Sequence, residues 1–252
     1  MAVIHDITEQ MKLETVRREF VSNVSHELRT PLTNVKSYAE TMIMTEKLPQ
    51  ETLHSFASVI VSEADRMTRI VQDLLTLSKF DYGKMDWRIS RVDFLVILPS
   101  VREAMLMEAK RRKHELILEM PQALPVIYGD RQRLEQVLFN IVANALTYTP
   151  DGGKIVMRAE HRDGSIFLSV QDNGIGIPKE DLPRLFERFY RVDKARSRAM
   201  GGTGLGLSIA REIVQKHYGD IRADSLPGQG TTVTIRLPES VPQEMEEDTD
   251  NA

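Results

Sequence analysis

The chain of 252 residues has no cysteine, a single tryptophan and no long uninterrupted apolar run. Without cysteine it cannot form disulfides or thiolate metal sites, which fits a reducing compartment. No stretch approaches the roughly 18 consecutive apolar residues that cross a bilayer, and the N-terminus lacks a signal-peptide pattern. An excess of positive charge is also absent, because 33 Lys and Arg are interspersed with 37 Asp and Glu. The composition predicts a soluble chain with no direct nucleic-acid partner.

The apolar residues, 41% of the chain, are enough for two modest domains with cores of their own. Helical periodicity covers residues 8–46 and 51–80, and the break at Leu48 and Pro49 suits a reversal of the chain. Apolar residues at three- and four-residue steps predict a buried stripe on each helix, formed by Phe20, Val24, Leu28, Leu32, Val35 and Ala39 on the first and by Leu53, Phe56, Ile60, Met67, Ile70, Leu74 and Leu77 on the second. Because two helices alone bury too little surface, we expect a homodimer that completes a four-helix bundle.

Helical periodicity ends at the sequence DYGK, residues 81–84, and a mixed pattern follows. The spacing predicts helices at residues 101–112 and 131–146, and strands at residues 116–119, 154–159, 165–171 and 231–237. This order predicts a sheet with helices on one face, joined to the helical hairpin by a hinge. The residues from 239 onward are rich in acidic side chains without apolar periodicity, which predicts a disordered tail.

A histidine stands between a hydroxyl and an acid in SHELRTPL, residues 25–32. The apolar stripe leaves His26 on the solvent face, where an isolated histidine is most often an ordinary surface residue. Glu27 can accept a proton or a hydrogen bond from one ring nitrogen, which frees the lone pair of the other nitrogen for attack. Pro31 removes a backbone hydrogen bond and kinks the helix at a cost of about 3 kcal/mol. These features favour a titratable nucleophile over a plain coiled-coil spacer.

Two asparagines four residues apart lie in EQVLFNIVANALTY, residues 135–148. Asn140 and Asn144 project from one face of the predicted helix, and the apolar residues between them can face the core. Amide oxygens can share a hydrated Mg²⁺ and leave phosphate oxygens to complete its shell. Taken alone, the pair is equally compatible with two capping or surface residues.

Two glycine-containing segments follow. DNGIGIP, residues 172–178, comes directly after a strand, and Asp172 can accept a hydrogen bond from an adenine amino group while Gly174 and Gly176 let the backbone approach the base or ribose. GGTGLGLSIAREIV, residues 201–214, is a glycine-rich loop that opens a helix, an arrangement that suits a triphosphate. Each segment alone is weak, because DNG is a common turn and a glycine string can be a flexible loop.

These motifs together resemble bacterial sensor histidine kinases. SHELRTPL resembles their H box, and the later segments resemble the N, G1, F and G2 boxes of the GHKL ATP-binding fold that histidine kinases share with gyrase-type topoisomerases, Hsp90 and MutL. The likeness runs from about residue 5 to residue 237, and RFYRVDKAR with GGTGLGLSIA is especially similar to cell-wall sensors of Gram-positive bacteria. It implies a multidomain α and α+β protein, in which a HisKA dimerisation hairpin (residues 11–82) and a hinge (83–90) precede an α/β sandwich that binds ATP (91–238).

The resemblance also implies a role for each matched residue. His26 would be phosphorylated from ATP, and Glu27 would hold the proton of the other ring nitrogen. Thr30, which completes the phosphatase motif Glu-x-x-Thr, would orient a water that dephosphorylates the partner regulator. Phe186 and Phe189 of the F box LFERFYR would anchor a lid, and Arg191 would reach the terminal phosphate, where its planar fork suits phosphate oxygens.

The remaining implied positions form the nucleotide site. Asn144 would be the principal Mg²⁺ ligand with Asn140 beside it, and Asp172 would be the adenine acceptor. The other implied ATP-binding residues are Tyr148, Gly174, Gly176, Gly202, Thr203, Gly204, Leu205, Gly206 and Thr231. Two positions depart from the family pattern: Thr147 stands where many members carry a lysine, and His217-Tyr218-Gly219 replaces the usual HGG.

The implied function is ATP-dependent autophosphorylation of His26, transfer of the phosphoryl group to an aspartate of a response regulator, and dephosphorylation of that regulator. Residues 1–10 resemble the end of a PAS domain and linker, so we expect the cytoplasmic portion of a cell-membrane receptor whose membrane segments are absent from this chain. Three alternatives remain: a scaffold that binds ATP without transfer, a GHKL ATPase of the chaperone or DNA-repair kind, and a PAS-linked structural module. The intact His26 and Asn144 weigh against the first, and the H-box hairpin weighs against the second.

Overall fold

The computed structural model describes residues 8–45, 47–193 and 202–240. The expected PAS-like start (residues 1–7) and most of the expected acidic tail (241–252) lie outside the described residues. The chain divides into two compact units, and the division falls at residues 75 and 76, inside the second helix. Gly202 and Thr203 group with the first unit, and residues from Gly204 onward group with the second.

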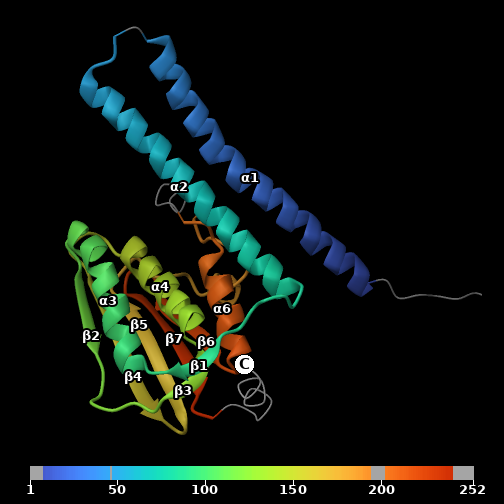
Figure 1. Ribbon diagram of the computed structural model, residues 1–252, viewed down its shortest axis with the longest axis vertical. Helices are drawn as coiled ribbons and strands as arrows, with labels where there is room; N and C mark the ends of the chain where they lie inside the picture. Colours follow the sequence, from blue (N-terminus) through green and yellow to red (C-terminus); the bar gives the residue numbers. More distant parts are fainter. Residues whose placement is uncertain (1–7, 46, 194–201, 241–252) are drawn as a thin grey trace, which may run out of the picture. The chain divides into compact units, whose positions relative to one another are not determined.

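The first unit is a pair of long helices, α1 (Thr8–Met44) and α2 (Gln50–Asp81), as Figure 1 shows. Three contacts fix their antiparallel register. Tyr38 and Phe56 meet edge to face with ring centroids 5.0 Å apart, the amide of Asn34 donates to Glu63 at 2.7 Å, and Arg66 donates to Glu27 at 3.0 Å. Each pair is farther apart in sequence than the one before it, as a hairpin requires. The predicted hairpin is confirmed, and α1 continues through Pro31 without interruption.

The stripe predicted to be buried on α1 does not form the contact between the two helices. That contact uses residues one position away, with Glu27 and Pro31 buried and Asn34 and Tyr38 half-buried. Leu32 of the predicted stripe is 56% exposed, and the other five members are only half-buried. On α2, Ile70 and Leu77 are buried as predicted, but Leu53 is exposed and the remaining members are half-buried. One partner helix covers only part of an apolar face, so the apolar stripe is left incompletely buried within one chain.

The second unit contains a five-stranded sheet in the order β2-β4-β5-β7-β6, in which only the β2–β4 pair is parallel. The strands are β2 (Glu115–Glu119), β4 (Lys154–Arg162), β5 (Ser165–Asp172), β6 (Asp220–Leu226) and β7 (Gly230–Pro238). A separate antiparallel pair joins β1 (Ile89–Val92) to β3 (Ile127–Asp130). The helices α3 (Phe94–Arg111), α4 (Arg131–Tyr148) and α6 (Gly206–Lys216) cover one face of the sheet in Figure 1, and a short 3-10 helix, η1 (Leu182–Arg184), follows β5.

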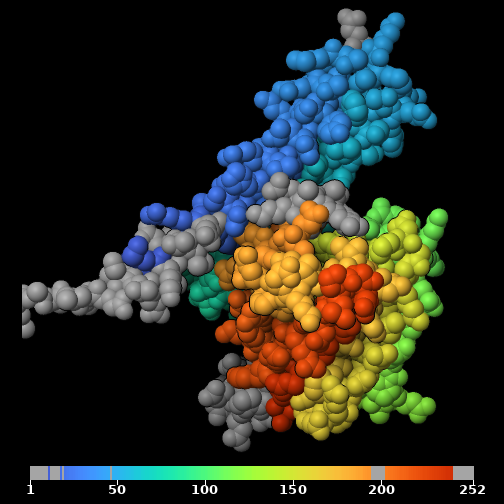
Figure 2. Space-filling view, turned by 180° about the vertical axis from the view of Figure 1, so that it is seen from behind, coloured from blue at the N-terminus to red at the C-terminus, as the bar shows by residue number. Residues whose placement is uncertain are grey.

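Alternation along β5 separates the core from the surface. Ile166, Leu168 and Val170 are buried, whereas Phe167 and Ser169 between them are half-buried and Gln171 is exposed. Figure 2 shows the unit from behind, where residues from the later part of the chain, coloured yellow to red, reach the surface. A sheet with helices on one face and solvent on the other confirms the predicted α/β sandwich.

Several elements were not predicted. The strands β1, β3 and β6 are short or polar, and α3 begins seven residues before the predicted start. Asp93 caps α3 by accepting a hydrogen bond from the backbone of Leu95 at 2.9 Å, and Pro99 lies in the second turn of this helix. The proline obscures the periodicity of the first turns, because a proline inside a helical pattern ordinarily marks a helix end.

Candidate functional site

The helix α4 carries both asparagines of the predicted nucleotide site. Asp130 caps its N-terminus by accepting a hydrogen bond from the backbone of Arg133 at 3.1 Å. One face of α4 is buried, and Asn140 and Asn144 lie half-buried, one helical turn apart. The amide of Asn140 donates to the backbone carbonyl of Gly206 at 3.0 Å, so α4 is joined to the first residue of α6. The structure therefore brings the N-box helix and the glycine-rich loop together.

Asp172 lies at the end of β5 and is buried. Its Oδ1 accepts hydrogen bonds from the backbone N–H groups of Gly174 at 2.8 Å and Thr231 at 3.2 Å. Burial raises the pKa of this carboxyl, and the two backbone hydrogen bonds oppose that rise by favouring the charged form. Because both donors bind the same oxygen, Asp172 is held in one orientation, as an adenine acceptor requires.

The loop after Asp172 packs closely against its neighbours. A Cβ on Gly174 would stand 2.5 Å from the carbonyl oxygen of Tyr148, and one on Gly176, whose φ is +68°, would stand 2.0 Å from that of Leu226. The backbone N–H of Ile175 donates to Tyr148 at 3.2 Å. Only glycine fits at these two positions, because the loop that follows β5 lies directly against the backbone at the end of α4 and at the end of β6. The approach of this loop to a base or ribose stays a prediction.

The F-box segment is joined to the glycine-rich loop through Phe189 and Gly204. The backbone N–H of Phe189, which has a φ of +63°, donates to the carbonyl of Gly204 at 2.8 Å. Gly204 has a φ of +72°, and a Cβ there would lie 3.1 Å from Nε of Arg191. Arg191 is thereby placed beside the glycine-rich loop, and Leu205 is fully buried directly before α6. Phe186 is half-buried in the same segment.

Most of the predicted nucleotide residues therefore lie within the second unit. Tyr148 is half-buried at the end of α4, and Thr231, near the start of β7, contacts Asp172 through its backbone. Gly202 and Thr203 are half-buried and group with the helical unit. Amide oxygens from α4 beside a glycine-rich helix N-terminus suit a hydrated divalent cation and phosphate oxygens, so the residues present fit Mg²⁺ bound with a nucleotide.

In the helical unit, His26 is exposed on α1, as predicted. Glu27 is only 8% exposed and points to α2, where its carboxylate accepts a hydrogen bond from Nη2 of Arg66 at 3.0 Å. Thr30 is half-buried one turn beyond His26, and its hydroxyl donates to the backbone carbonyl of His26 at 3.3 Å. The histidine is therefore open to a phosphoryl donor, and the adjacent carboxylate is fixed from the other helix.

Sequence reasoning missed Arg66. It is only 4% exposed, lies 3.8 Å from Glu63 as well as 3.0 Å from Glu27, and its Nε has no hydrogen-bond partner among the described residues. A buried polar atom without a partner costs about 1–3 kcal/mol. A signal was present in the sequence, because Glu63 and Arg66 continue the three- and four-residue steps that lead to the buried Ile70 and Leu77. Charged residues in a buried stripe mark an interhelical pair.

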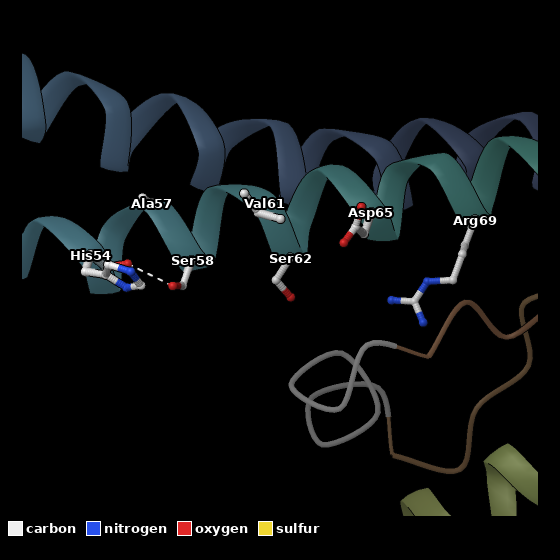
Figure 3. A pocket seen from close by; sticks show the side chains of 7 residues that line it. All are labelled: His54, Ala57, Ser58, Val61, Ser62, Asp65 and Arg69. Carbon is white, nitrogen blue, oxygen red and sulfur yellow. Dashed lines mark hydrogen bonds between the residues drawn. The ribbon is translucent and has the colours of Figure 1, made fainter. Parts of the chain in front are cut away.

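A shallow groove runs along one face of α2, and Figure 3 shows its lining. All seven lining residues come from this helix: His54, Ala57, Ser58, Val61, Ser62, Asp65 and Arg69. The hydroxyl of Ser58 donates to the backbone carbonyl of His54 at 2.8 Å, and Val61 is 59% exposed. The groove is a surface feature of the hairpin separate from His26, which lies on α1.

Comparison with known proteins agrees with this arrangement. Residues 16–83 match the His Kinase A phospho-acceptor domain, and residues 129–241 match the histidine kinase-, DNA gyrase B- and HSP90-like ATPase domain. The chain belongs to the sensor histidine kinase family, which combines these two domains. The phospho-acceptor domain also separates it from the chaperone and DNA-repair ATPases that share only the second fold.

The curated relatives include WalK sensor kinases, the type expected from RFYRVDKAR and GGTGLGLSIA. The chain is 44% identical to the sensor histidine kinase WalK of Bacillus subtilis over 254 aligned residues, which cover 100% of this chain and 41% of the relative. It is 41% identical to a Staphylococcus aureus WalK over 94% of this chain and 57% of that protein. The chain thus spans less than two thirds of these relatives.

Solved structures give the same fold. The histidine kinase AdeS of Acinetobacter baumannii superposes with a TM-score of 0.69 at 26% identity, over 86% of this chain and 98% of that one. The histidine kinase ThkA, solved in complex with the response regulator TrrA, superposes with a TM-score of 0.73 at 23% identity, over 95% of this chain and 68% of that one. No helix among the described residues has the length and apolarity needed to cross a membrane.

Proposed function

We propose that this chain is the catalytic core of a two-component sensor kinase that phosphorylates its own His26 from ATP. The observation that supports this most directly is the joint presence of two features. One is an exposed histidine beside a buried, fixed carboxylate, and the other is a separate unit with a nucleotide-binding set. An acceptor and a donor site on separate units joined through α2 suit a reaction in which one unit delivers a phosphoryl group to the other.

The transfer step uses residues of both units. A free ring nitrogen of His26 attacks the γ-phosphorus in line, the N–P bond forms, and the bond to the β,γ-bridging oxygen breaks to release ADP. Glu27 takes the proton of the other ring nitrogen. Arg191 offsets the charge that develops on the terminal phosphate. Mg²⁺ held by Asn144, with Asn140 beside it, would neutralise part of the triphosphate charge. Asp172 would select the adenine.

The phosphoryl group then passes from His26 to an aspartate of a separate response regulator that docks on the helical hairpin. The structure of ThkA with TrrA shows that a kinase of this fold can hold a regulator. Thr30 would orient the water that later dephosphorylates that regulator. The half-exposed apolar stripes of α1 and α2 favour a homodimer, since a second copy can cover them. We further propose that the chain is the cytoplasmic portion of a membrane receptor.

The direct test is incubation of the purified protein with γ-labelled ATP and Mg²⁺. The proposal predicts protein-bound label that is lost in acid and retained in alkali, as a phosphoramidate is. A protein that binds ATP but takes up no label would instead be the signalling scaffold described above.

A further inference from the structure

Four polar side chains form a cluster between α1 and α2, in which Glu27 and Arg66 are buried and Asn34 and Glu63 are half-buried. Arg66 lies in the middle. Its Nη2 is 3.0 Å from Glu27, its Nη1 is 3.8 Å from Glu63, and Asn34 donates to the other oxygen of Glu63 at 2.7 Å. The side chains of Arg66 and Glu27 are 5% and 10% exposed. The cluster is thus an interhelical network and not a surface ion pair.

Stability alone does not account for this cluster. A buried ion pair loses so much hydration that apolar residues of similar volume often replace it without loss of stability. The Nε of Arg66 is also buried without a partner among the described residues, which adds to the cost. A hairpin selected only for packing would be better served by apolar side chains here. The pair is placed where its chemistry has a use, because Glu27 directly follows the exposed His26.

A guanidinium that donates a hydrogen bond to a carboxylate limits the rotamers open to that carboxylate. Glu63 lies 3.8 Å from Arg66 and itself accepts a hydrogen bond from Asn34. The position of Glu27 is therefore determined by two layers of contacts.

We propose that Arg66 is a positioning residue for phosphorylation of His26: its hydrogen bond holds the carboxylate of Glu27, the residue that directly follows the histidine, in one orientation. The inference rests on the proposed autokinase function. Arg66 does not act on ATP or on the imidazole. In the transfer step, the proton of the ring nitrogen moves to Glu27 as the N–P bond forms and ADP leaves, and Arg66 limits the orientations of the Glu27 carboxylate during that step.

The test compares the full chain with Arg66→Met, Arg66→Lys, Glu27→Gln and the Glu27→Gln/Arg66→Met double variant. The measured quantities are the rate of His26 labelling at saturating ATP and the Kd for ATP. A general base contributes about 100-fold or more, so we expect Arg66→Met to slow labelling at least about tenfold without changing the Kd. Arg66→Lys, which keeps the charge but not the fork, should label at an intermediate rate.

The control is Lys36→Met, which breaks the exposed Lys36–Glu40 pair of α1 and should label at the parent rate. Circular dichroism and sedimentation check that the variants keep the fold and assembly of the parent. The double variant should be no slower than Glu27→Gln, because Arg66 acts through Glu27. A parent-like rate for Arg66→Met, a rate of Arg66→Lys no higher than that of Arg66→Met, or an additive loss in the double variant would each overturn the proposal. A parent protein without label would remove the proposed function, and this inference with it.

Discussion

The indole of Trp87 meets the imidazole of His217 edge to face, with ring centroids 5.5 Å apart. The imidazole is buried, its Nε2 accepts a hydrogen bond from the backbone N–H of Asp130 at 2.9 Å, and its Nδ1 therefore donates to the carbonyl of Ile213 at 2.8 Å. Asp130 in turn caps α4 and accepts from the backbone of Arg88 at 3.0 Å. The segment that follows α2 thus contacts the N-terminal end of α4 through Asp130 and the C-terminal end of α6 through His217.

The burial of His217 predicts that the folded protein loses stability in acid. Burial lowers the pKa of His217, so the folded protein binds the proton less readily than the unfolded chain. The contribution of neutral, buried His217 to the free energy of unfolding is therefore fully present above the pKa of histidine in the unfolded chain, about 6.5. It is lost as the pH falls below that value, at first by about 1 kcal/mol per pH unit. Urea unfolding at about pH 7.5 and 5.5, followed by the fluorescence of Trp87, the only tryptophan, measures this. His217→Gln should reduce the pH dependence, whereas the exposed His161→Gln should retain it.

Alanine substitutions at two glycines distinguish the cost of backbone strain from the effect of a steric clash. Gly204 and Gly228 have φ values of +72° and +74°, but a Cβ on Gly204 would lie 3.0 Å from Cα of Phe189, whereas none on Gly228 meets any atom within 4 Å. Alanine at either position costs about 1 kcal/mol for the left-handed conformation. Only Gly204→Ala should also disturb the F-box segment and weaken ATP binding, by about tenfold or more. Calorimetric titration with ATP checks this, and equal Kd values for the two variants would contradict the described contact.

Asn144→Asp should strongly impair autophosphorylation. A carboxylate changes the charge at the metal and repels the triphosphate, although the side chain keeps its size. The measurement is the labelling rate as a function of Mg²⁺ concentration. Gln132→Glu makes the same chemical change at an exposed position near the start of α4 and should leave the rate unchanged. An unaltered rate and Mg²⁺ dependence in Asn144→Asp would remove Asn144 from the metal site.

The segments proposed to bind the nucleotide could be found in the sequence because each is local. Asp172 with Gly174 is a turn of adjacent residues, and Asn140 with Asn144 is one turn of a helix. The contact between Glu27 and Arg66 joins residues 39 positions apart, and the apolar pattern indicated the neighbouring face of α1 instead. Periodicity finds an amphipathic helix, but it does not determine which part of a wide apolar face meets the helix of the same chain.

Thr30→Ala should separate two activities. Phosphorylation of His26 does not use the Thr30 hydroxyl, whereas dephosphorylation of a regulator needs a positioned water that a methyl group cannot hold. We expect near-normal labelling of His26 and a longer lifetime of purified phospho-regulator in the presence of the variant. Thr33→Ala is the matched control, because the Thr33 hydroxyl makes the same kind of bond, to Arg29 at 2.9 Å, at an exposed site. Equal dephosphorylation rates for the Thr30→Ala variant and the parent would leave Thr30 without this role.

The central claim, that His26 is the phosphoryl acceptor, is tested most directly by labelling the His26→Gln variant with γ-labelled ATP. His26 belongs to the first unit and the proposed nucleotide residues Asn144 and Asp172 belong to the second, so the variant should bind ATP with the Kd of the parent and take up no acid-labile label. His54→Gln removes the other exposed histidine of the hairpin, on α2, and should label as the parent does. Acid-labile, alkali-stable label that persists on purified His26→Gln would contradict the account, because the nucleophile would then be another residue.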